Sequence, residues 1–229
     1  DRIIKKAKEL RGEITPPADK SISHRAVMFA SLAKGQSRIK NFLLAADPLS
    51  SLNAMKSLGV EIAITDSKEI IVNGKGLYSL KEPDNVIDCG NSGTTIRLLS
   101  GILAGQPFLT VLTGDDSLRY RPMKRIINPL SLMGANIMGR AENKFPPIVI
   151  KGSFLKGINY EMPIASAQVK SAILLAGVYA KGETTLTEPH KSRDHTEKML
   201  KNMGIDININ DNIIKLFPPD HELNPLDIT

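Results

Sequence analysis

A threefold internal repeat constrains the fold of this chain more than any other feature of its sequence. The segments "LGVEI", "MGANI" and "MGIDI" each place a glycine between the apolar end of a helix and the alternating start of a strand. Their glycines are Gly59, Gly134 and Gly204. An earlier glycine, in "AKGQSRI", "LAGQPFL" and "AKGETTL", ends another helix of each repeat. Self-similarity over such a distance indicates one structural unit that is used three times.

Each repeat is predicted to contain two helices and, after them, a small set of short strands. The predicted helices are 21–34 and 47–58, then 92–104 and 122–133, then 166–180 and 193–203. The predicted strands are 37–42, 60–65 and 69–73, then 108–112, 135–138 and 147–151, then 183–188, 205–209 and 213–216. The first helix of each repeat is apolar almost all round, which indicates burial. We therefore expect an α/β domain with approximate threefold symmetry around three buried, parallel helices.

The three buried helices begin in similar polar sequences. These sequences are "DKSISHR", "GNSGTTIR" and "ASAQVKS", and each has a basic residue close by. A helix N-terminus presents unpaired N–H groups and a partial positive charge. If the threefold symmetry gathers the three N-termini at one end of the domain, they form a surface suited to anions.

Each of these motifs also has a purely structural explanation. In "DKSISHR", Asp19 or Ser21 can cap a helix that simply carries two solvated cations, Lys20 and Arg25. "GNSGTTIR" can be a tight turn between a strand and a helix. "SLRYRPMKR" has four cations around Pro122, which we expect at the first helical position. Cations are unfavourable at a helix N-terminus, so we expect an anionic ligand beside at least one of them.

The composition excludes several classes of function. Aromatic residues make up 4% of the chain and Trp is absent, which argues against modules that stack nucleic-acid bases. One cysteine, Cys89, allows no disulfide within the chain and no cysteine-based zinc site. The histidines do not have the spacing of metal ligands. The longest apolar run is too short to span a bilayer and no signal peptide is visible, so we expect a cytoplasmic protein.

The motifs together resemble a known enzyme family. In chain order they are "PADKSISHRA", "GNSGTTIRLLSG", "RPMKRI", "ASAQVKSAILLAG" and "SRDHTEKML". Over about residues 12–229 the sequence is similar to the 5-enolpyruvylshikimate-3-phosphate synthases, most of all to the subgroup that includes glyphosate-insensitive enzymes. The family joins shikimate-3-phosphate to phosphoenolpyruvate and releases phosphate, a step of aromatic amino-acid biosynthesis. The resemblance implies no metal and no organic cofactor.

The resemblance also implies a domain organisation. Members have two domains, each of three βαβαββ units whose helix N-termini face the cleft between the domains. Here the units are expected at 15–75, 85–152 and 157–217, within a substrate-binding domain of residues 15–229. Residues 1–14 are expected to pack with a second domain that this chain lacks. The proton-transfer carboxylates belong to that domain, so the resemblance implies a chain inactive alone and a monomeric full-length enzyme, without nucleic-acid or membrane partners.

Two substrate subsites follow from the resemblance, residue by residue. The shikimate-3-phosphate subsite is expected to comprise Lys20, Ser21, Arg25, Ser166, Ala167, Gln168 and Arg193. The phosphoenolpyruvate subsite is expected to comprise Lys20, Asn91, Gly93, Thr94 and Arg121. Lys20 would contact both substrates and act in catalysis. Ala167 replaces a serine of other members, and Gly93 is the common glycine where some insensitive enzymes carry alanine, so the response to glyphosate stays open.

Two other functions remain as alternatives. The sister enolpyruvyl transferase that acts on UDP-N-acetylglucosamine has the same fold, but it is expected to carry a lysine–asparagine pair and a catalytic cysteine in a loop. Here the pair is Lys20–Ser21, and Cys89 falls at a predicted strand end. A non-catalytic phosphate- or RNA-binding module would use the net charge of +6 and the three basic N-termini.

Overall fold

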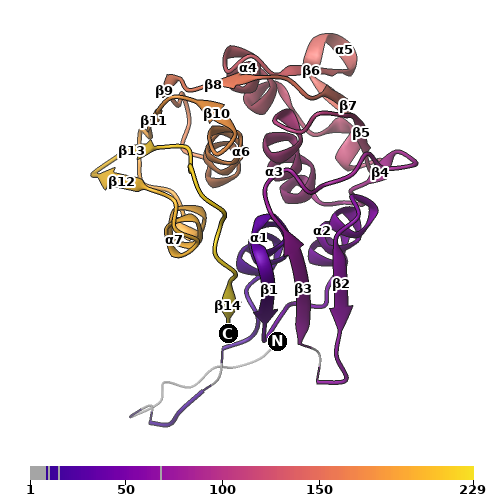
Figure 1. Ribbon diagram of the computed structural model, residues 1–229, viewed down its shortest axis with the longest axis vertical. Coiled ribbons are helices and arrows are strands. Elements are labelled where there is room, and N and C mark those ends of the chain that lie inside the picture. Colours follow the sequence, from indigo (N-terminus) through magenta and orange to yellow (C-terminus); the bar gives the residue numbers. More distant parts are fainter. Residues whose placement is uncertain (1–8, 10, 15, 68) are drawn as a thin grey trace.

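A computed structural model describes residues 9, 11–14, 16–67 and 69–229 of the chain. Each repeat contributes two main helices to the body, as the sequence predicts (Figure 1). They are α1 (Lys20–Leu32) and α2 (Ala46–Ser57), α3 (Gly93–Ala104) and α4 (Lys124–Leu132), and α6 (Ala167–Gly177) and α7 (His195–Asn202). The short helices η1 (Leu118–Tyr120) and α5 (Arg140–Asn143) lie within the second repeat.

Each repeat also builds one four-stranded sheet. The first sheet has the order β14-β1-β3-β2, and its strands are β14 (Asp227–Ile228), β1 (Lys34–Ile39), β3 (Ile70–Lys75) and β2 (Glu61–Ile64). The second has the order β4-β5-β7-β6, with β4 (Ile87–Asp88), β5 (Leu109–Thr113), β7 (Phe145–Lys151) and β6 (Asn136–Gly139). The third comprises β9 (Asn159–Glu161), β11 (Thr184–Thr187), β13 (Ile213–Leu216) and β12 (Ile207–Asn210). A short parallel pair joins β8 (Leu155–Lys156) to β10 (Ala180–Lys181).

The three sheets share one pattern of pairing. In each, a short outer strand runs parallel to the second strand, and the remaining pairs are antiparallel. The second and third repeats take the outer strand, β4 or β9, from the residues just before their first main helix. The first sheet takes it from β14, close to the other end of the chain, with Arg38 opposite Asp227. The chain thus links its last segment to its first repeat.

The core lies around the first helix of each repeat. Figure 1 shows α1, α3 and α6 nearly end-on in the middle of the molecule, with the sheets around them. Most of the residues in these three helices are buried. The helices α3 and α6 approach so closely that a β-carbon at Gly101 would lie 2.2 Å from the carbonyl oxygen of Ala172. Glycine is therefore required by packing at that position.

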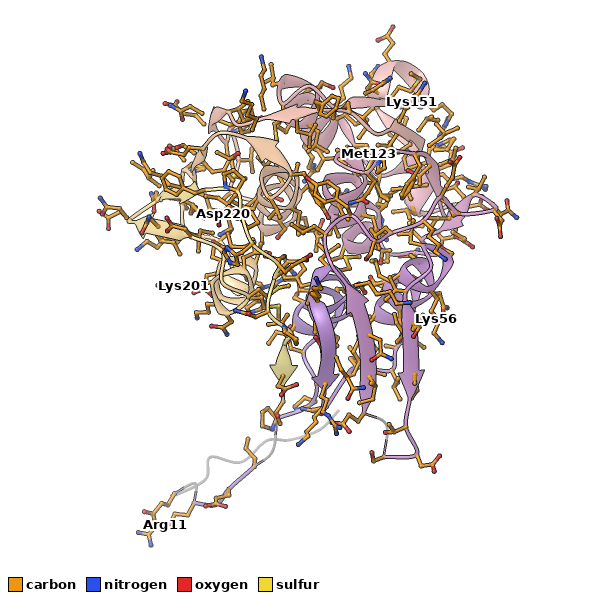
Figure 2. The ribbon with its side chains drawn as sticks, in the orientation of Figure 1. Arg11, Lys56, Met123, Lys151, Lys201 and Asp220 are labelled. Atoms are coloured by element: carbon orange, nitrogen blue, oxygen red, sulfur yellow. The ribbon has the colours of Figure 1, made fainter. Side chains whose placement is uncertain are left out.

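Charged side chains lie at the molecular surface. Figure 2 shows Lys56, Lys151 and Lys201 reaching outward from three different parts of the body, whereas Met123 lies among the interior side chains. Met123 is fully buried and packs in the hydrophobic core.

The helix and strand predictions are confirmed, with boundaries that differ by a few residues. Pro122 is not the first residue of α4, because the helix begins at Lys124 and Met123 occupies its N-cap. Strand β1 begins at Lys34, before the predicted start at residue 37. The sequence does not indicate the strands β4, β8, β9 and β10, because two or three residues are too few to show an alternating pattern.

The predicted packing of residues 1–14 with a second domain falls mostly outside the described residues. Those of the segment that are described, 9 and 11–14, form no helix or strand. Within the residues described, no helix is long and apolar enough to cross a membrane. The same residues contain no cluster of three or more His, Cys, Asp or Glu side chains that could hold a metal ion.

Candidate functional site

The start of α1 is held by a side-chain cap. The carboxylate of Asp19 accepts a hydrogen bond from the backbone N–H of Ile22 at 2.8 Å, so Asp19 rather than Ser21 caps the helix. Lys20 follows at the surface, and its ammonium group pairs with the carboxylate of Asp47 in the first turn of α2. The sequence analysis missed Asp47, although an acidic residue in the first turn of a helix is a recognisable signal.

The start of α3 carries the residues expected around phosphoenolpyruvate. Ser92 caps the helix by accepting from the N–H of Thr95 at 3.0 Å. Asn91 lies just before it, accepts a hydrogen bond from Arg121 and donates another to Asp115 at 2.8 Å. The N–H of Leu118 and the amide of Asn91 both donate to Asp115 and hold the pKa of that carboxyl below its usual value. Arg121 is thereby fixed beside the helix N-terminus.

Gly93 is packed beneath two guanidinium groups. A β-carbon at this position would lie 2.7 Å from Nη1 of Arg97 and 3.1 Å from Nη1 of Arg121. An alanine here would therefore displace at least one of the two side chains. The glycine keeps both cations close to the N-terminus of α3.

The start of α6 is joined directly to the start of α3. Ser166 caps α6, Ala167 is its first residue, and Gln168 reaches across to α3. The amide of Gln168 donates to the Thr94 hydroxyl at 2.9 Å, and its oxygen accepts from Arg97 at 2.5 Å. A residue expected at shikimate-3-phosphate thus contacts one expected at phosphoenolpyruvate.

The segment before α7 completes the contact between the N-termini. Arg193 is exposed, and its guanidinium group donates to the hydroxyl of Ser21 at 3.2 Å. Gln168 thus joins the start of α6 to the start of α3, and Arg193 joins the segment before α7 to the start of α1. We call this region the helix-start surface, and define it by Lys20, Ser21, Asn91, Thr94, Arg121, Gln168 and Arg193.

Arg25 lies below this surface. It is 2% exposed and donates to the hydroxyls of Thr196 and Ser171, each at 2.7 Å, and to the carbonyl oxygen of Ser21 at 3.1 Å. Burial lowers the pKa of Arg25 to about 10, so it stays charged at neutral pH. The visible function of Arg25 is to join α1, α6 and α7, and its predicted contact with substrate stays a prediction.

A second buried group, which we call the neutral cluster, comprises His24, Ser51, Thr95 and Ser92 and joins α1, α2 and α3. The Thr95 hydroxyl donates its proton to Ser92 at 2.7 Å, so Ser51 must donate to Thr95, also at 2.7 Å. Ser51 then accepts from Nδ1 of His24 at 2.6 Å. The proton therefore resides on Nδ1, and Nε2 is a buried acceptor without a partner among the described residues.

This arrangement explains the protonation state of His24. A second proton on Nε2 would be buried without an acceptor. Burial, and secondarily the charge of Lys20, lowers the pKa of His24 to about 4. His24 is consequently neutral at physiological pH and contributes no charge to the helix-start surface.

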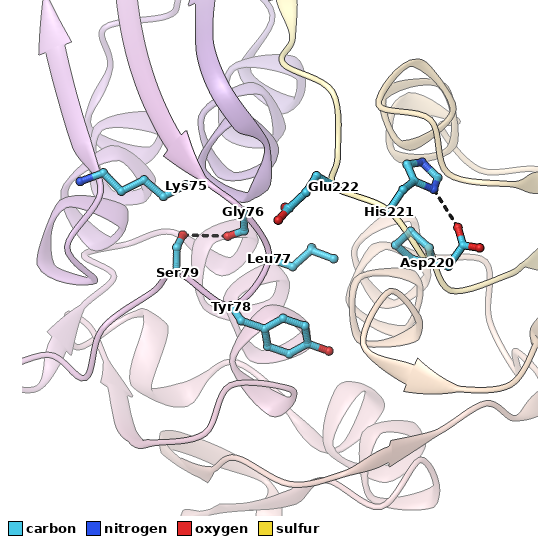
Figure 3. Close-up of a pocket in the computed structure, with 9 residues that line it drawn as sticks. Lys75, Gly76, Leu77, Tyr78, Ser79, Asp220, His221 and Glu222 are labelled. Atoms are coloured by element: carbon cyan, nitrogen blue, oxygen red, sulfur yellow. Dashed lines mark hydrogen bonds and ion pairs between the residues drawn. The ribbon is translucent and has the colours of Figure 1, made fainter.

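The pocket of Figure 3 lies apart from the helix-start surface, whereas the carbonyl oxygen of Cys89 accepts from the N–H of Ser92, the cap of α3, at 2.9 Å. Cys89 is fully buried, and burial raises the pKa of its thiol, which argues against the cysteine-dependent sister enzyme. The pocket, of about 550 Å³, is lined by Lys75, Tyr78, His221, Glu222 and their neighbours (Figure 3). It lies at the other end of α1, where the N–H of Gly76 donates to the carbonyl of Ala33 at 2.9 Å.

Known proteins match this chain along nearly all of its length. The family model described as EPSP synthase (3-phosphoshikimate 1-carboxyvinyltransferase) matches residues 4–228. A 3-phosphoshikimate 1-carboxyvinyltransferase of Thermodesulfovibrio yellowstonii is 90% identical over 229 residues, which are 100% of this chain and 53% of the relative. The Bacillus subtilis protein of the same name is 55% identical over 200 residues, which are 87% of this chain and 46% of that protein.

A solved structure agrees with these matches. An EPSP synthase from Acinetobacter baumannii superposes with a TM-score of 0.90 at 47% sequence identity, over 94% of this chain and 48% of that one. The chain therefore spans about half the length of the curated relatives and the solved structure that it matches.

Proposed function

Since this chain belongs to the EPSP synthase (3-phosphoshikimate 1-carboxyvinyltransferase) family, we propose that it is the shikimate-3-phosphate-binding half of such an enzyme. The whole enzyme transfers the enolpyruvyl group of phosphoenolpyruvate to shikimate-3-phosphate and releases phosphate. The observation that carries the proposal is the helix-start surface, where the starts of α3 and α6 are in contact, Arg121 adjoins the start of α3, and Arg193 adjoins the start of α1 beside Lys20. Such a surface suits two phosphorylated anions because N–H dipoles and cations face the same place.

The shikimate-3-phosphate subsite lies between α1, α6 and α7 in this proposal. Arg193 and Ser21 are in contact and bind the phosphate with Ser166, while Gln168 binds the ring. Ala167 offers no side-chain donor, so the first turn of α6 supplies its N–H groups instead. Arg25 supports Ser21 from below through its carbonyl oxygen.

The phosphoenolpyruvate subsite adjoins it at the start of α3. Arg121 and Asn91 are joined by a hydrogen bond, and Thr94 is joined to Gln168 of the neighbouring subsite. Gly93 leaves room for the two guanidinium groups above it. Lys20 lies at the start of α1 as a mobile point charge able to contact both anions, after it leaves Asp47.

The chain alone is proposed to bind shikimate-3-phosphate without turning it over. Two of the carboxylates beside the helix-start surface, Asp47 and Asp115, are already engaged with Lys20 and Asn91. The groups that move protons during the reaction are assigned to the other half of the enzyme. That half corresponds to the length of the relatives which this chain does not cover.

Calorimetric titration with shikimate-3-phosphate tests the binding proposal. We expect saturable binding that weakens on the order of ten- to a hundredfold in Lys20→Ala and in Arg193→Ala, since each removes a charge-assisted hydrogen bond to an anion. Lys201→Ala is the matched control, because Lys201 is an exposed cation on α7 outside the helix-start surface. Binding that is absent, or equally strong in all variants, would contradict the proposal.

Two further measurements separate this function from its rivals. Turnover by the chain alone would contradict the assignment of proton transfer to the other half. RNA binding that depends on salt and ignores shikimate-3-phosphate would favour the non-catalytic module.

A further inference from the structure

Lys170 is a fully buried cation that the proposed reaction does not use. It lies in α6, one turn after Ser166, and its side chain is 1% exposed. We propose that Lys170 is a positioning residue that fixes the segment presenting Arg193 at the helix-start surface. The inference rests on the proposed function only for the identity of the anion that Arg193 binds.

The ammonium group of Lys170 is clamped between two buried carboxylates. Its Nζ lies 2.8 Å from Oε2 of Glu188 and 2.6 Å from Oε1 of Glu197. The side chains of Glu188 and Glu197 are 3% and 2% exposed. We call these three residues the charged cluster. An ion pair so well excluded from water is directional and is broken only at a large cost.

The two carboxylates stand on opposite sides of the segment that carries Arg193. Glu188 is the residue that follows β11, and Glu197 lies in the first turn of α7. Residues 189–193 run between them. Lys170 therefore ties both ends of this segment to a single point on α6.

Glu188 also holds the segment directly. While one of its oxygens binds Lys170, the other accepts a hydrogen bond from the hydroxyl of Ser192, the residue just before Arg193. In the part of the chain that the structure describes, the backbone of 189–193 makes no hydrogen bond to another backbone group. Side-chain hydrogen bonds therefore hold this segment. Lys170 is connected to Arg193 through Glu188 and Ser192.

Glu197 connects the same lysine to the other partners of the subsite. Its neighbour Thr196 accepts from Arg25 and bonds to Ser171 of α6 at 2.6 Å. Arg25 in turn donates to the carbonyl oxygen of Ser21, whose hydroxyl accepts from Arg193. The charged cluster therefore supports both partners of the Arg193–Ser21 contact, from opposite sides.

Backbone ¹⁵N relaxation of the 229-residue chain tests the positioning directly, without a ligand. Ser192→Ala removes only the link between Glu188 and the segment, and it leaves the buried ion pairs intact. We expect the backbone order parameters of residues 190–194 to fall from about 0.85 to below about 0.6, while those of α6 stay unchanged. Ser79→Ala is the matched control, because Ser79 makes one local hydrogen bond, to Gly76 beside the pocket of Figure 3. Unchanged order parameters at 190–194 in Ser192→Ala would overturn the proposal.

The affinity for shikimate-3-phosphate tests the functional consequence. We expect Ser192→Ala to weaken binding about three- to tenfold, and Lys170→Met to weaken it more wherever that variant folds. In an Arg193→Ala background both substitutions should have no further effect on affinity, because they act through Arg193. If the cluster had a purely structural role, substitutions in it would lower stability equally in both backgrounds. Their effect on affinity would then not depend on Arg193.

The ligand-free measurement and the affinity measurement together distinguish failure of this inference from failure of the proposed function. If the unsubstituted chain does not bind shikimate-3-phosphate, the proposed function is contradicted, and the relaxation measurement still decides the inference. If it binds and Ser192→Ala binds as tightly as the unsubstituted chain, the positioning role is wrong. Effects of equal size with and without Arg193 would also overturn it.

Discussion

The two buried polar clusters beneath the helix-start surface support it in different ways. The neutral cluster joins α1, α2 and α3 through a chain of hydroxyls that ends at His24. The charged cluster joins α6, β11 and α7 through Lys170 and two carboxylates. Both lie in the interior, but only one of them contains formal charges at neutral pH.

The difference shows what each half of the surface requires. The neutral cluster links helices that already pack against one another, so hydrogen bonds of ordinary strength are sufficient. The charged cluster holds an irregular segment that has little other support, and a buried ion pair resists displacement more strongly. The loss of unfolding free energy on breaking a cluster should therefore differ between the two clusters, both in size and in its dependence on pH.

The largest effect on the unfolding free energy is expected from Lys170→Met. Both carboxylates would remain buried without their cation, and removing one partner of a buried pair costs about 3–5 kcal/mol of unfolding free energy. Urea unfolding followed by circular dichroism measures this loss. The double variant Lys170→Met/Glu197→Leu removes one of the stranded charges and should be less destabilised than Lys170→Met. A double variant that is less stable than the single one would contradict the electrostatic explanation.

The next largest effect is the loss of unfolding free energy that acid causes through the neutral cluster. The pKa of His24 is about 4 in the folded chain and 6.5 when unperturbed, so the unfolded chain binds this proton more readily. Stability is then fully present above pH 6.5 and decreases as the pH falls toward 4, by about 3 kcal/mol in all. His24→Asn should remove this part of the pH dependence. Urea unfolding between pH 7 and pH 4 provides the measurement, and parallel profiles for the two proteins would show that His24 is not responsible.

A smaller effect is expected from Ser51→Ala. This change leaves Nδ1 of His24 without its acceptor and Thr95 without its donor, at a cost of about 1–3 kcal/mol. Ser50→Ala is the matched control on the same helix, because Ser50 bonds only to the carbonyl of Ala46. Thermal unfolding should separate the two variants, and equal melting temperatures would indicate that the hydroxyl chain contributes little.

The smallest effect on stability is expected from Asp47→Asn. Its partner Lys20 is largely exposed, and ion pairs of this kind contribute about 0–1 kcal/mol. Affinity should respond in the opposite direction, because Lys20 no longer has a competing carboxylate. We expect binding of shikimate-3-phosphate to strengthen about threefold. Calorimetry measures this affinity. Weaker binding would mean that Asp47 orients Lys20 toward the ligand and does not compete with the ligand for Lys20.

The sequence was sufficient to predict the elements that are long enough to show a periodic pattern of apolar residues. The buried helices, the repeated glycines and the polar helix starts all follow from periodicity and composition, and the helix boundaries lie close to those of the structure. The contacts of Gln168 with Thr94 and of Arg193 with Ser21 agree with the expectation that the N-termini meet. The family resemblance supplied the substrates, which no pattern of residues identifies.

The two buried clusters could not be predicted from the sequence. Lys170 lies in an apolar helix where a lone lysine gives no indication of its partners, and Glu188 and Glu197 are 18 and 27 residues away. The burial of Arg25 was missed for the same reason, since its acceptors Ser171 and Thr196 belong to the third repeat. The contacts of Arg25 and of the neutral cluster depend on how repeats meet, and a period within the chain carries no information about that.

The pairing of β14 with β1 makes this domain a closed ring of repeats. In an open array the terminal repeats have one neighbour each and unfold first. Here Leu226 and Ile228 accept hydrogen bonds from the N–H groups of Arg38 and Lys40, so the first repeat has a neighbour on both sides. In the described part of the chain, the first repeat is therefore held both by the second repeat and by the segment after the third, which favours a single cooperative transition. The same closure covers the edge of β1 and removes a strand on which another chain could assemble.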